Sequence, residues 1–334
     1  MSELQLASFG LDRPESGDDV AVPFALENLD CRGRAVRLGE ALDTIISRHR
    51  YPEPVARLLG EAVVLATLIG SSLKFEGKFI LQTQTDGPVN LLVVDLDAPD
   101  GLRGYARFDA EAVDKAVLEG RTSPGQLLGK GHLAMTVDQG THMDRYQGIV
   151  ALEGGSLEDV AHTYFQQSEQ VPTLVRIAVG QLSRKGGRHP HWRAGGVLVQ
   201  YLPPHGEKAM PDLPGDGDFA NPDTADRDFK ESDKWTETRA LLATVADDEL
   251  IDPSVSAERL LFRLFHETGV RVFEPAPLEE RCTCSVERIE AMLRDNFSAE
   301  ERADMVVNGE IEVVCEFCSA DYHFHLHEFD ETQH

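Results

Sequence analysis

The sequence predicts an α+β protein that ends in a small unit with four cysteines. Three observations support this prediction. Apolar residues recur at helical spacing over residues 38–75, and the period changes to two from residue 77 onward. Four of the five cysteines form two close pairs near the C-terminus, Cys282 with Cys284 and Cys315 with Cys318. We therefore divide the chain into four parts: 1–202, 203–234, 235–281 and 282–334.

The N-terminal part begins with a strand region, residues 4–29, which a loop rich in Asp, Gly and Pro interrupts. A first helix carries apolar residues from Leu38 to Ile46 and ends before Pro52. A second helix, residues 54–75, is apolar on nearly all sides, which predicts a buried central helix. We interpret His49, at the end of the first helix, as a capping or surface residue and not as a catalytic base.

Period-two alternation then predicts an antiparallel sheet with a helix over residues 109–118. Ser156 with Asp159 is typical of a capping box, which predicts another helix start. The predicted strands are 78–85, 90–96, 102–108, 132–137, 146–152, 173–182 and 195–202. We expect these elements to form one mixed helix and antiparallel-sheet domain over residues 1–202.

Residues 203–234 contain five prolines and many aspartates with few large apolar residues, which predicts an irregular, acidic connector. Two amphipathic helices follow. Ser232 is placed to cap the first, which carries Trp235, Leu241 and Leu242. Ser256 is placed to cap the second, which carries Leu260, Leu261, Leu264 and Phe265. We expect them to form a helical linker over residues 235–281.

The two cysteine pairs are separated by residues 285–314, a length that suits one small folded loop. Four thiolates in such an arrangement can bind one tetrahedral Zn²⁺, so we expect Cys282, Cys284, Cys315 and Cys318 to be its ligands. His323, His325 and His327 alternate along the last strand and are further candidate ligands. Since four thiolates complete the site, we interpret these histidines as a surface stripe, and Cys31 as an unpaired residue.

The same four sulfurs can hold a metal or react with oxidants, because the thiolate is the species that both require. The first pair is a C-x-C and the second a C-x-x-C, whereas many structural zinc ribbons have C-x-x-C at both ends. Spacing alone leaves two interpretations open: a static zinc knuckle, or a site that loses its metal when the thiols are oxidised.

Composition and motifs exclude several classes of function. A net charge of −26 argues against nucleic acid or an anionic membrane as the main partner. The first 20 residues lack a basic region followed by an apolar run, and no segment has the roughly 20 apolar residues of a membrane span, so we expect a cytoplasmic protein. No catalytic triad, nucleotide-binding loop or pair of catalytic carboxylates stands out, which predicts that the protein is not an enzyme.

The C-terminal sequence closely resembles the heat shock protein 33 family, the redox-regulated holdase chaperones. The stretches that carry the resemblance are residues 260–267 (LLFRLFHE), 270–273 (VRVF), 281–285 (RCTCS) and 311–318 (IEVVCEFC), with Tyr322 and, nearer the N-terminus, 180–182 and 195–200. This resemblance covers nearly the whole chain. It implies one Zn²⁺ per chain on the four cysteines in the reduced, inactive protein. It also implies disulfides Cys282–Cys284 and Cys315–Cys318 in the active one.

The resemblance implies an ATP-independent chaperone that binds unfolding client proteins under oxidative stress. It assigns residues 1–202 as the chaperone core, 235–281 as a redox-sensitive linker and 282–334 as the redox switch. We also expect the oxidised form to be capable of homodimerisation. Two alternatives come from other classes: a constitutive zinc-ribbon adaptor that binds a folded partner, and a thiol oxidoreductase that uses Cys315 and Cys318.

Overall fold

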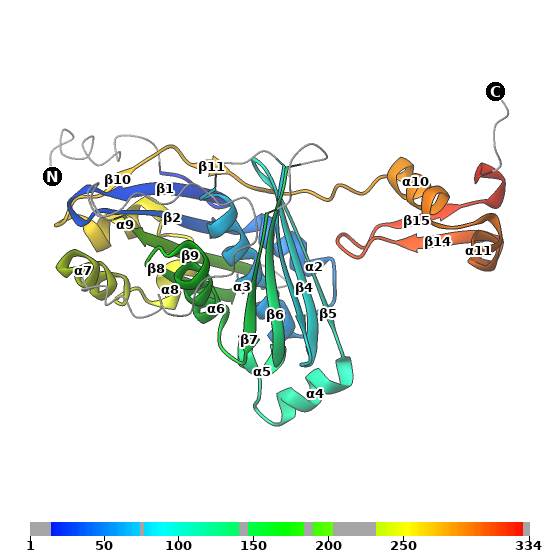
Figure 1. The fold of residues 1–334 in the computed structure, drawn as a ribbon, viewed down its shortest axis with the longest axis horizontal. Coiled ribbons are helices and arrows are strands. Elements are labelled where there is room, and N and C mark those ends of the chain that lie inside the picture. Colours follow the sequence, from blue (N-terminus) through cyan, green and yellow to red (C-terminus); the bar gives the residue numbers. More distant parts are fainter. Residues whose placement is uncertain (1–14, 74–76, 140–145, 184–189, 203–231, 330–334) are drawn as a thin grey trace.

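The computed structural model describes the chain except for residues 1–14, 74–76, 140–145, 184–189, 203–231 and 330–334. It confirms the predicted α+β class, with helices packed on largely antiparallel sheets and a small cysteine-containing unit at the C-terminal end (Figure 1). Most of the predicted connector and the start of the first strand region lie outside the described residues.

The first sheet has the strand order β10-β1-β2-β9-β8, and β11 also pairs with β1. Its strands are β1 (Val20–Leu26), β2 (Cys31–Leu38), β8 (Thr173–Leu182), β9 (His191–Tyr201), β10 (Arg271–Val272) and β11 (Ala276–Pro277). All pairs in this sheet are antiparallel. The sequence analysis missed β2 and wrongly assigned Leu38, its last residue, to the following helix.

The second sheet has the strand order β12-β5-β4-β3-β6-β7. Its strands are β3 (Lys78–Thr85), β4 (Val89–Asp97), β5 (Gly101–Phe108), β6 (Lys130–Asp138), β7 (Tyr146–Glu153) and β12 (Glu279–Glu280). The pairing is antiparallel except for β12, which lies parallel to β5. Strand β3 has the predicted bounds, and β4 to β7 were predicted to within a few residues.

Helix α3 (Glu53–Gly70) lies between the two sheets, with α2 (Glu40–Ser47) before it (Figure 1). As predicted, α3 is buried on nearly all sides, and its apolar side chains belong to one core cluster with strands of both sheets. The helices α4 (Ala110–Leu118), α5 (Pro124–Leu128) and α6 (Leu157–Tyr164) complete this part of the chain. The capping box at Ser156 is confirmed, because its hydroxyl accepts from the backbone N–H of Asp159.

A second core cluster lies on the other face of the first sheet, under three helices. These are α7 (Asp233–Leu242), α8 (Asp247–Ile251) and α9 (Ala257–Phe265). Ser256 caps α9 as predicted, whereas Ser232 occupies the N-cap of α7 without a side-chain capping bond. Leu261 and Phe265 are fully buried, and the ring of Phe265 stacks on Phe24 of β1 with centroids 6.2 Å apart. We call the described residues from 20 to 265 the body.

Residues 270–281, which we call the strap, run from α9 along both sheets of the body. They contribute β10 and β11 to the first sheet and β12 to the second. Val270 and Leu278 are buried, one in each core cluster of the body. The strap therefore connects the linker helices physically to the C-terminal unit.

Residues 282–329, which we call the module, project from the end of the body (Figure 1). Its elements are α10 (Val286–Asn296), α11 (Ala299–Asp304), β13 (Val306–Val307), β14 (Glu310–Val314), β15 (Asp321–Phe324) and a 3₁₀ turn, Leu326–Phe329. Asn308 and Gly309 both have positive φ in the turn between β13 and β14, as the hairpin prediction requires. Its core is a separate cluster of five buried residues: Ile289, Leu293, Ile311, Phe324 and Phe329.

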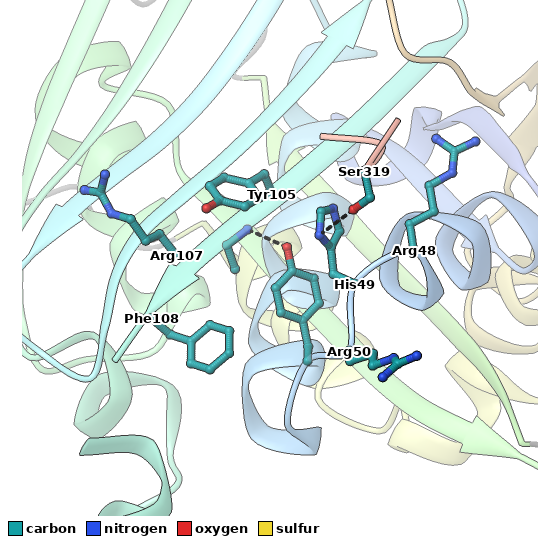
Figure 2. A pocket seen from close by; sticks show the side chains of 9 residues that line it. Arg48, His49, Arg50, Tyr105, Arg107, Phe108 and Ser319 are labelled. Carbon is teal, nitrogen blue, oxygen red and sulfur yellow. Dashed lines mark hydrogen bonds between the residues drawn. The ribbon is translucent and has the colours of Figure 1, made fainter. Parts of the chain in front are cut away.

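The module meets the body beside a pocket that Figure 2 shows, between the end of α2 and strand β5. Three arginines, His49 and three aromatic rings line most of this pocket, and Ser319 of the module reaches its edge. Ser319 Oγ lies 3.2 Å from His49 Nδ1 (Figure 2). His49, interpreted from the sequence as a capping or surface residue, is therefore a contact between the two units.

Candidate metal centre

The four paired cysteines come together at the end of the module that faces the body. Cys282 and Cys284 lie between the strap and α10, and Ser285 caps that helix with its hydroxyl. Cys315 and Cys318 lie in the turn between β14 and β15. The backbone N–H of Ser319 donates to the carbonyl of Cys315, and the N–H of Cys315 donates to that of Ala320, which tightens this turn. The hairpin therefore presents both thiols of the second pair to the first pair.

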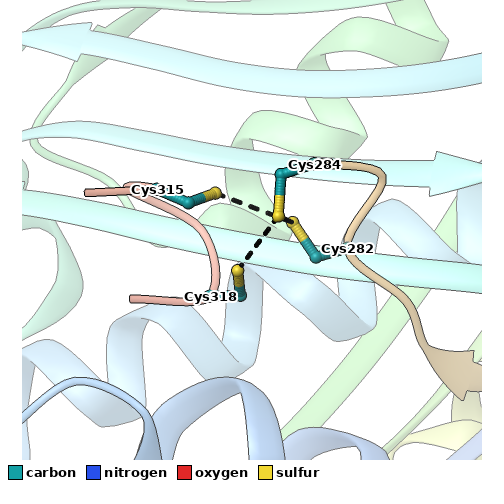
Figure 3. Close-up of side chains that lie close together, drawn as sticks. All are labelled: Cys282, Cys284, Cys315 and Cys318. Carbon is teal, nitrogen blue, oxygen red and sulfur yellow. Dashed lines mark hydrogen bonds between the residues drawn. The ribbon is translucent and has the colours of Figure 1, made fainter. Parts of the chain in front are cut away.

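The distances between the sulfurs suit a tetrahedral metal site (Figure 3). The Sγ of Cys284 lies 3.3 Å from both Cys282 Sγ and Cys318 Sγ, and Cys282 Sγ lies 3.7 Å from Cys315 Sγ. All four sulfurs lie within 4.8 Å of one another. Four sulfurs at about 2.3 Å from a zinc ion are about 3.8 Å apart, whereas bonded disulfide sulfurs are about 2.05 Å apart. The cluster therefore has the spacing of a four-thiolate site that could hold a metal ion.

Hydrogen bonds around the sulfurs favour the thiolate at one position. Burial raises the pKa of Cys284, but the hydroxyl of Tyr322 and the neighbouring thiols outweigh it and lower this pKa to about 7. The Tyr322 hydroxyl donates to Cys284 Sγ at 3.1 Å, and this bond is the main reason that the pKa of Tyr322 is raised. Burial raises the pKa values of Cys282 and Cys318. The hydrogen bonds around Cys284 therefore favour its thiolate.

A side chain of the body reaches this site from strand β5. Arg103 Nη1 donates to Thr283 Oγ1 at 3.0 Å, between the two cysteines of the first pair. Burial alone would lower the pKa of Arg103, but Asp95 and the sulfur of Cys282 outweigh it and raise this pKa. The guanidinium carbon also lies 4.0 Å from the centre of the Phe317 ring, in the second cysteine pair's turn. Arg103 therefore touches both halves of the cluster.

The sequence analysis did not find the residues that join the module to the body. His49 Nε2 lies 3.1 Å from the carbonyl oxygen of Phe317, and the rings of Phe317 and Tyr105 are 6.3 Å apart. Burial and a hydrogen bond to Glu316 raise the pKa of Tyr105. No spacing pattern links these residues, because they lie on different elements that are far apart in sequence.

The other candidate ligands do not join the cluster. All three histidines are exposed, but only His323 lies on the last strand, because β15 ends at Phe324 and His325 and His327 follow it. His323 and His325 contact Glu310 at 3.1 and 3.6 Å. Cys31 is a free, buried thiol in the body, and burial raises its pKa to about 11. Among the described residues, these four cysteines form the one group of histidine, cysteine or acidic side chains placed to share a metal.

Comparison with known proteins identifies the family. The family model described as Hsp33 protein matches residues 19–325. The chain belongs to the heat shock protein 33 family. A relative from Caulobacter vibrioides named 33 kDa chaperonin is 51% identical over 314 residues, covering 92% of this chain and 96% of that protein. A relative of the same name from Aliivibrio salmonicida is 36% identical over 301 residues and covers 90% of each chain.

A solved structure shows the same fold. The heat shock protein 33 homologue of Thermotoga maritima superposes with a TM-score of 0.70 at 21% sequence identity, over 93% of this chain and 97% of that one. The family and the names of its members support a chaperone, which agrees with the function expected from the sequence. In the part of the chain that the structure describes, no helix combines the length and apolar content needed to cross a bilayer.

Proposed function

We propose that this heat shock protein 33 member is an oxidation-activated, ATP-independent holdase that binds unfolding proteins and prevents their aggregation during oxidative stress. The observation that supports this proposal is the cluster of four free thiols within 4.8 Å of one another, in a module whose described residues form a core of five buried apolar side chains. Apolar burial in such a small core contributes little folding free energy. The fold of the module would therefore depend on a metal crosslink between the thiols.

In the reduced state, Cys282, Cys284, Cys315 and Cys318 would hold one Zn²⁺ per chain. Four thiolate sulfurs in a tetrahedral arrangement favour zinc among the metals that proteins commonly bind. Bound zinc would crosslink the start of α10 to the β14–β15 turn and keep the thiols deprotonated. Tyr322 would support this state because its hydroxyl donates to Cys284 Sγ.

Oxidation would convert the ligands into two disulfides, Cys282–Cys284 and Cys315–Cys318. Each disulfide forms when two thiolates give up two electrons to a two-electron oxidant such as peroxide, which is reduced to water or hydroxide. All four ligands are consumed, so the zinc is released. The disulfides join residues within one loop each and do not connect the two halves of the module. The module would then unfold.

The strap would carry this change to the client-binding surface. The helices α7 to α9 and the module belong to separate apolar clusters, so the helices are not stabilised by packing on the module core. The connection is instead the chain between Val270 and Arg281, with Arg281 Nη2 bonded to Asp100 Oδ1 at 2.8 Å and Arg48 paired with Glu280. Once the module unfolds, the two-residue strands of the strap are short enough to detach.

Release of the strap and the linker helices would uncover an apolar surface on the first sheet. The side chains that we expect to become accessible are Leu241, Leu242, Leu260, Leu261, Leu264 and Phe265. An exposed apolar patch of this kind binds unfolded chains, and the net charge of −26 would keep the complex in solution. We also propose that the protein acts in the cytoplasm, without nucleic-acid or membrane partners, and that the oxidised form dimerises.

The test is to treat the purified reduced protein with peroxide or hypochlorite and to measure zinc release and suppression of client aggregation together. We expect one zinc per chain before oxidation, and holdase activity that rises as zinc is released. Cys31→Ser is the matched control. This thiol lies in the body, away from the four clustered cysteines, so the substitution should leave both responses unchanged. Binding of a folded partner in both redox states, without holdase activity, would support the adaptor instead. Catalytic turnover of disulfides would support an oxidoreductase.

A further inference from the structure

Arg103 is the only arginine that the described structure places against both cysteine pairs of the module. It lies on β5, in the body, and donates to Thr283 Oγ1 at 3.0 Å. The Phe317 ring lies under its guanidinium at 4.0 Å, an arrangement typical of a cation–π contact. Thr283, between the first two cysteines, and Phe317, between the second two, therefore both contact the side chain of Arg103 on β5.

A buried carboxylate fixes the position of this arginine. Asp95 on β4 is 4% exposed, and its Oδ2 accepts from Arg103 Nε at 2.7 Å and from Nη2 at 2.5 Å. A buried carboxylate without a positive partner is strongly destabilising. Asp95 therefore holds the Arg103 guanidinium in place. The remaining nitrogen, Nη1, is directed at the module. The body thus presents the positive charge of Arg103, in a fixed position, to the four cysteines.

The charge of the cluster depends on its redox state. A divalent ion held by the four thiolates would give the cluster two formal negative charges beside Arg103. If the thiolates give four electrons to two equivalents of peroxide, two neutral disulfides form, and no thiolate would remain to hold a metal ion. The charge that faces Arg103 then disappears, and the turn that carries Phe317 and Ser319 loses its metal crosslink.

We propose that Arg103 is a positioning residue that docks the reduced metal cluster on the body, and that oxidation releases the module by removing the negative charge that Arg103 holds. The proposal rests on the proposed function for the redox change itself. His49 is the second residue of the body that contacts this turn of the module, because Phe317 O and Ser319 Oγ lie 3.1 and 3.2 Å from its two ring nitrogens. Docking would keep the strap in place until the thiols are oxidised.

The experiment compares Arg103→Gln with Arg107→Gln in the full-length, zinc-loaded, reduced protein. Arg107 lies on the same strand and face but bonds Asn90 Oδ1 at 2.9 Å, so it is the matched control. Since Arg103→Gln leaves Asp95 unpaired, a second variant, Asp95→Asn with Arg103→Gln, makes both partners neutral. Hydrogen exchange is read at residues 48–51, 282–285 and 315–319, and zinc release is followed during peroxide treatment.

We expect both Arg103 variants to retain one zinc per chain, to exchange at least tenfold faster at these residues, and to release zinc at least threefold faster. Arg103→Lys should restore part of the protection, because it keeps the charge. Oxidation should add little further exchange at residues 48–51 in the Gln variants. Wild-type protection in both Gln variants would overturn the proposal, and so would loss of zinc from both, because Arg103 would then act in metal binding. These readouts need no client, so absent holdase activity would count against the proposed function alone.

Discussion

The body and the module fold by different means, although they are joined in one chain. The body encloses α3 between two large sheets and adds a second apolar layer under α7 to α9. The module has a core of five buried apolar side chains and places four thiols together at its edge. The first is stabilised mainly by apolar burial, and we propose that the second depends on a metal crosslink that oxidants can remove. Such an arrangement would let a chemical signal unfold the module while the sheets of the body persist.

The largest expected effect concerns the module, through Cys315→Ser. Structural zinc contributes roughly 10–16 kcal/mol of apparent binding energy in small zinc peptides, which is comparable to the whole stability of an ordinary domain. We expect this variant to lose the metal and to lose exchange protection over residues 282–329, with the sheets of the body unchanged. Metal analysis and regional hydrogen exchange measure both. A module that stays folded without metal would remove the proposed difference between the two regions.

The next effect concerns the apolar layer of the body, through Phe265→Ala. This fully buried ring stacks on Phe24, so its removal should cost about 3–5 kcal/mol and loosen α9. Client binding should then appear in the reduced protein while zinc is retained. Phe262→Ala is the control on the same helix, at a half-buried position, and should cost about 1 kcal/mol. Equal client binding by the two variants would argue against the surface under α9.

A third, smaller effect tests a half-buried carboxylate in the body. Burial raises the pKa of Glu61 on α3 to about 7, from an ordinary value of 4.5. The folded state therefore binds more protons between these two pH values, and stability falls as pH rises through this window. Glu61→Gln should leave stability unchanged near pH 4 and increase it by about 3 kcal/mol at pH 8.

Tryptophan fluorescence during urea unfolding measures this effect in the body alone, since Trp192 and Trp235 both lie outside residues 282–334. Glu53→Gln, at an exposed position on the same helix, is the control and should change stability by no more than about 0.5 kcal/mol. The same gain at pH 4 and pH 8 would show that packing, and not the charge, explains the effect of Glu61→Gln.

The smallest effect concerns one hydrogen bond in the module. Tyr322→Phe removes the donor to Cys284 Sγ and should weaken zinc binding about tenfold without abolishing it. Competition with a chelator measures the affinity. Tyr146→Phe removes a phenol from the body and should have no effect on it. Unchanged affinity in Tyr322→Phe would mean that the thiols hold the metal without this support.

The sequence predicted those elements that carry their own periodic signal. Strands β3 and β8 were predicted residue for residue, because alternation and turn residues define both ends. Strand β2 was missed because three arginines obscure its alternation, and one of them, Arg37, is buried with its guanidinium bonded to backbone carbonyls near α8. The two-residue strands of the strap carry no period at all, since only their partners in the body define them.

The cysteine cluster was predicted from spacing because close thiol pairs constrain their own geometry. The contacts of Arg103, Asp95 and His49 were not, because they depend on how two separately folded regions meet. A lone arginine on a strand and a lone histidine after a helix have many possible partners. Only the tertiary structure shows that both face the turn that carries Phe317.

We propose that oxidation unfolds the module and, through the strap, loosens the linker helices while the sheets of the body persist. Regional hydrogen exchange on the zinc-bound reduced form and the fully oxidised form, with client binding measured on the same samples, tests it most directly. The account predicts lost protection over residues 233–281 and 282–329, unchanged protection in β2 to β9, and client binding in the oxidised form alone. Full protection of residues 233–281 in an oxidised, client-binding protein would contradict it.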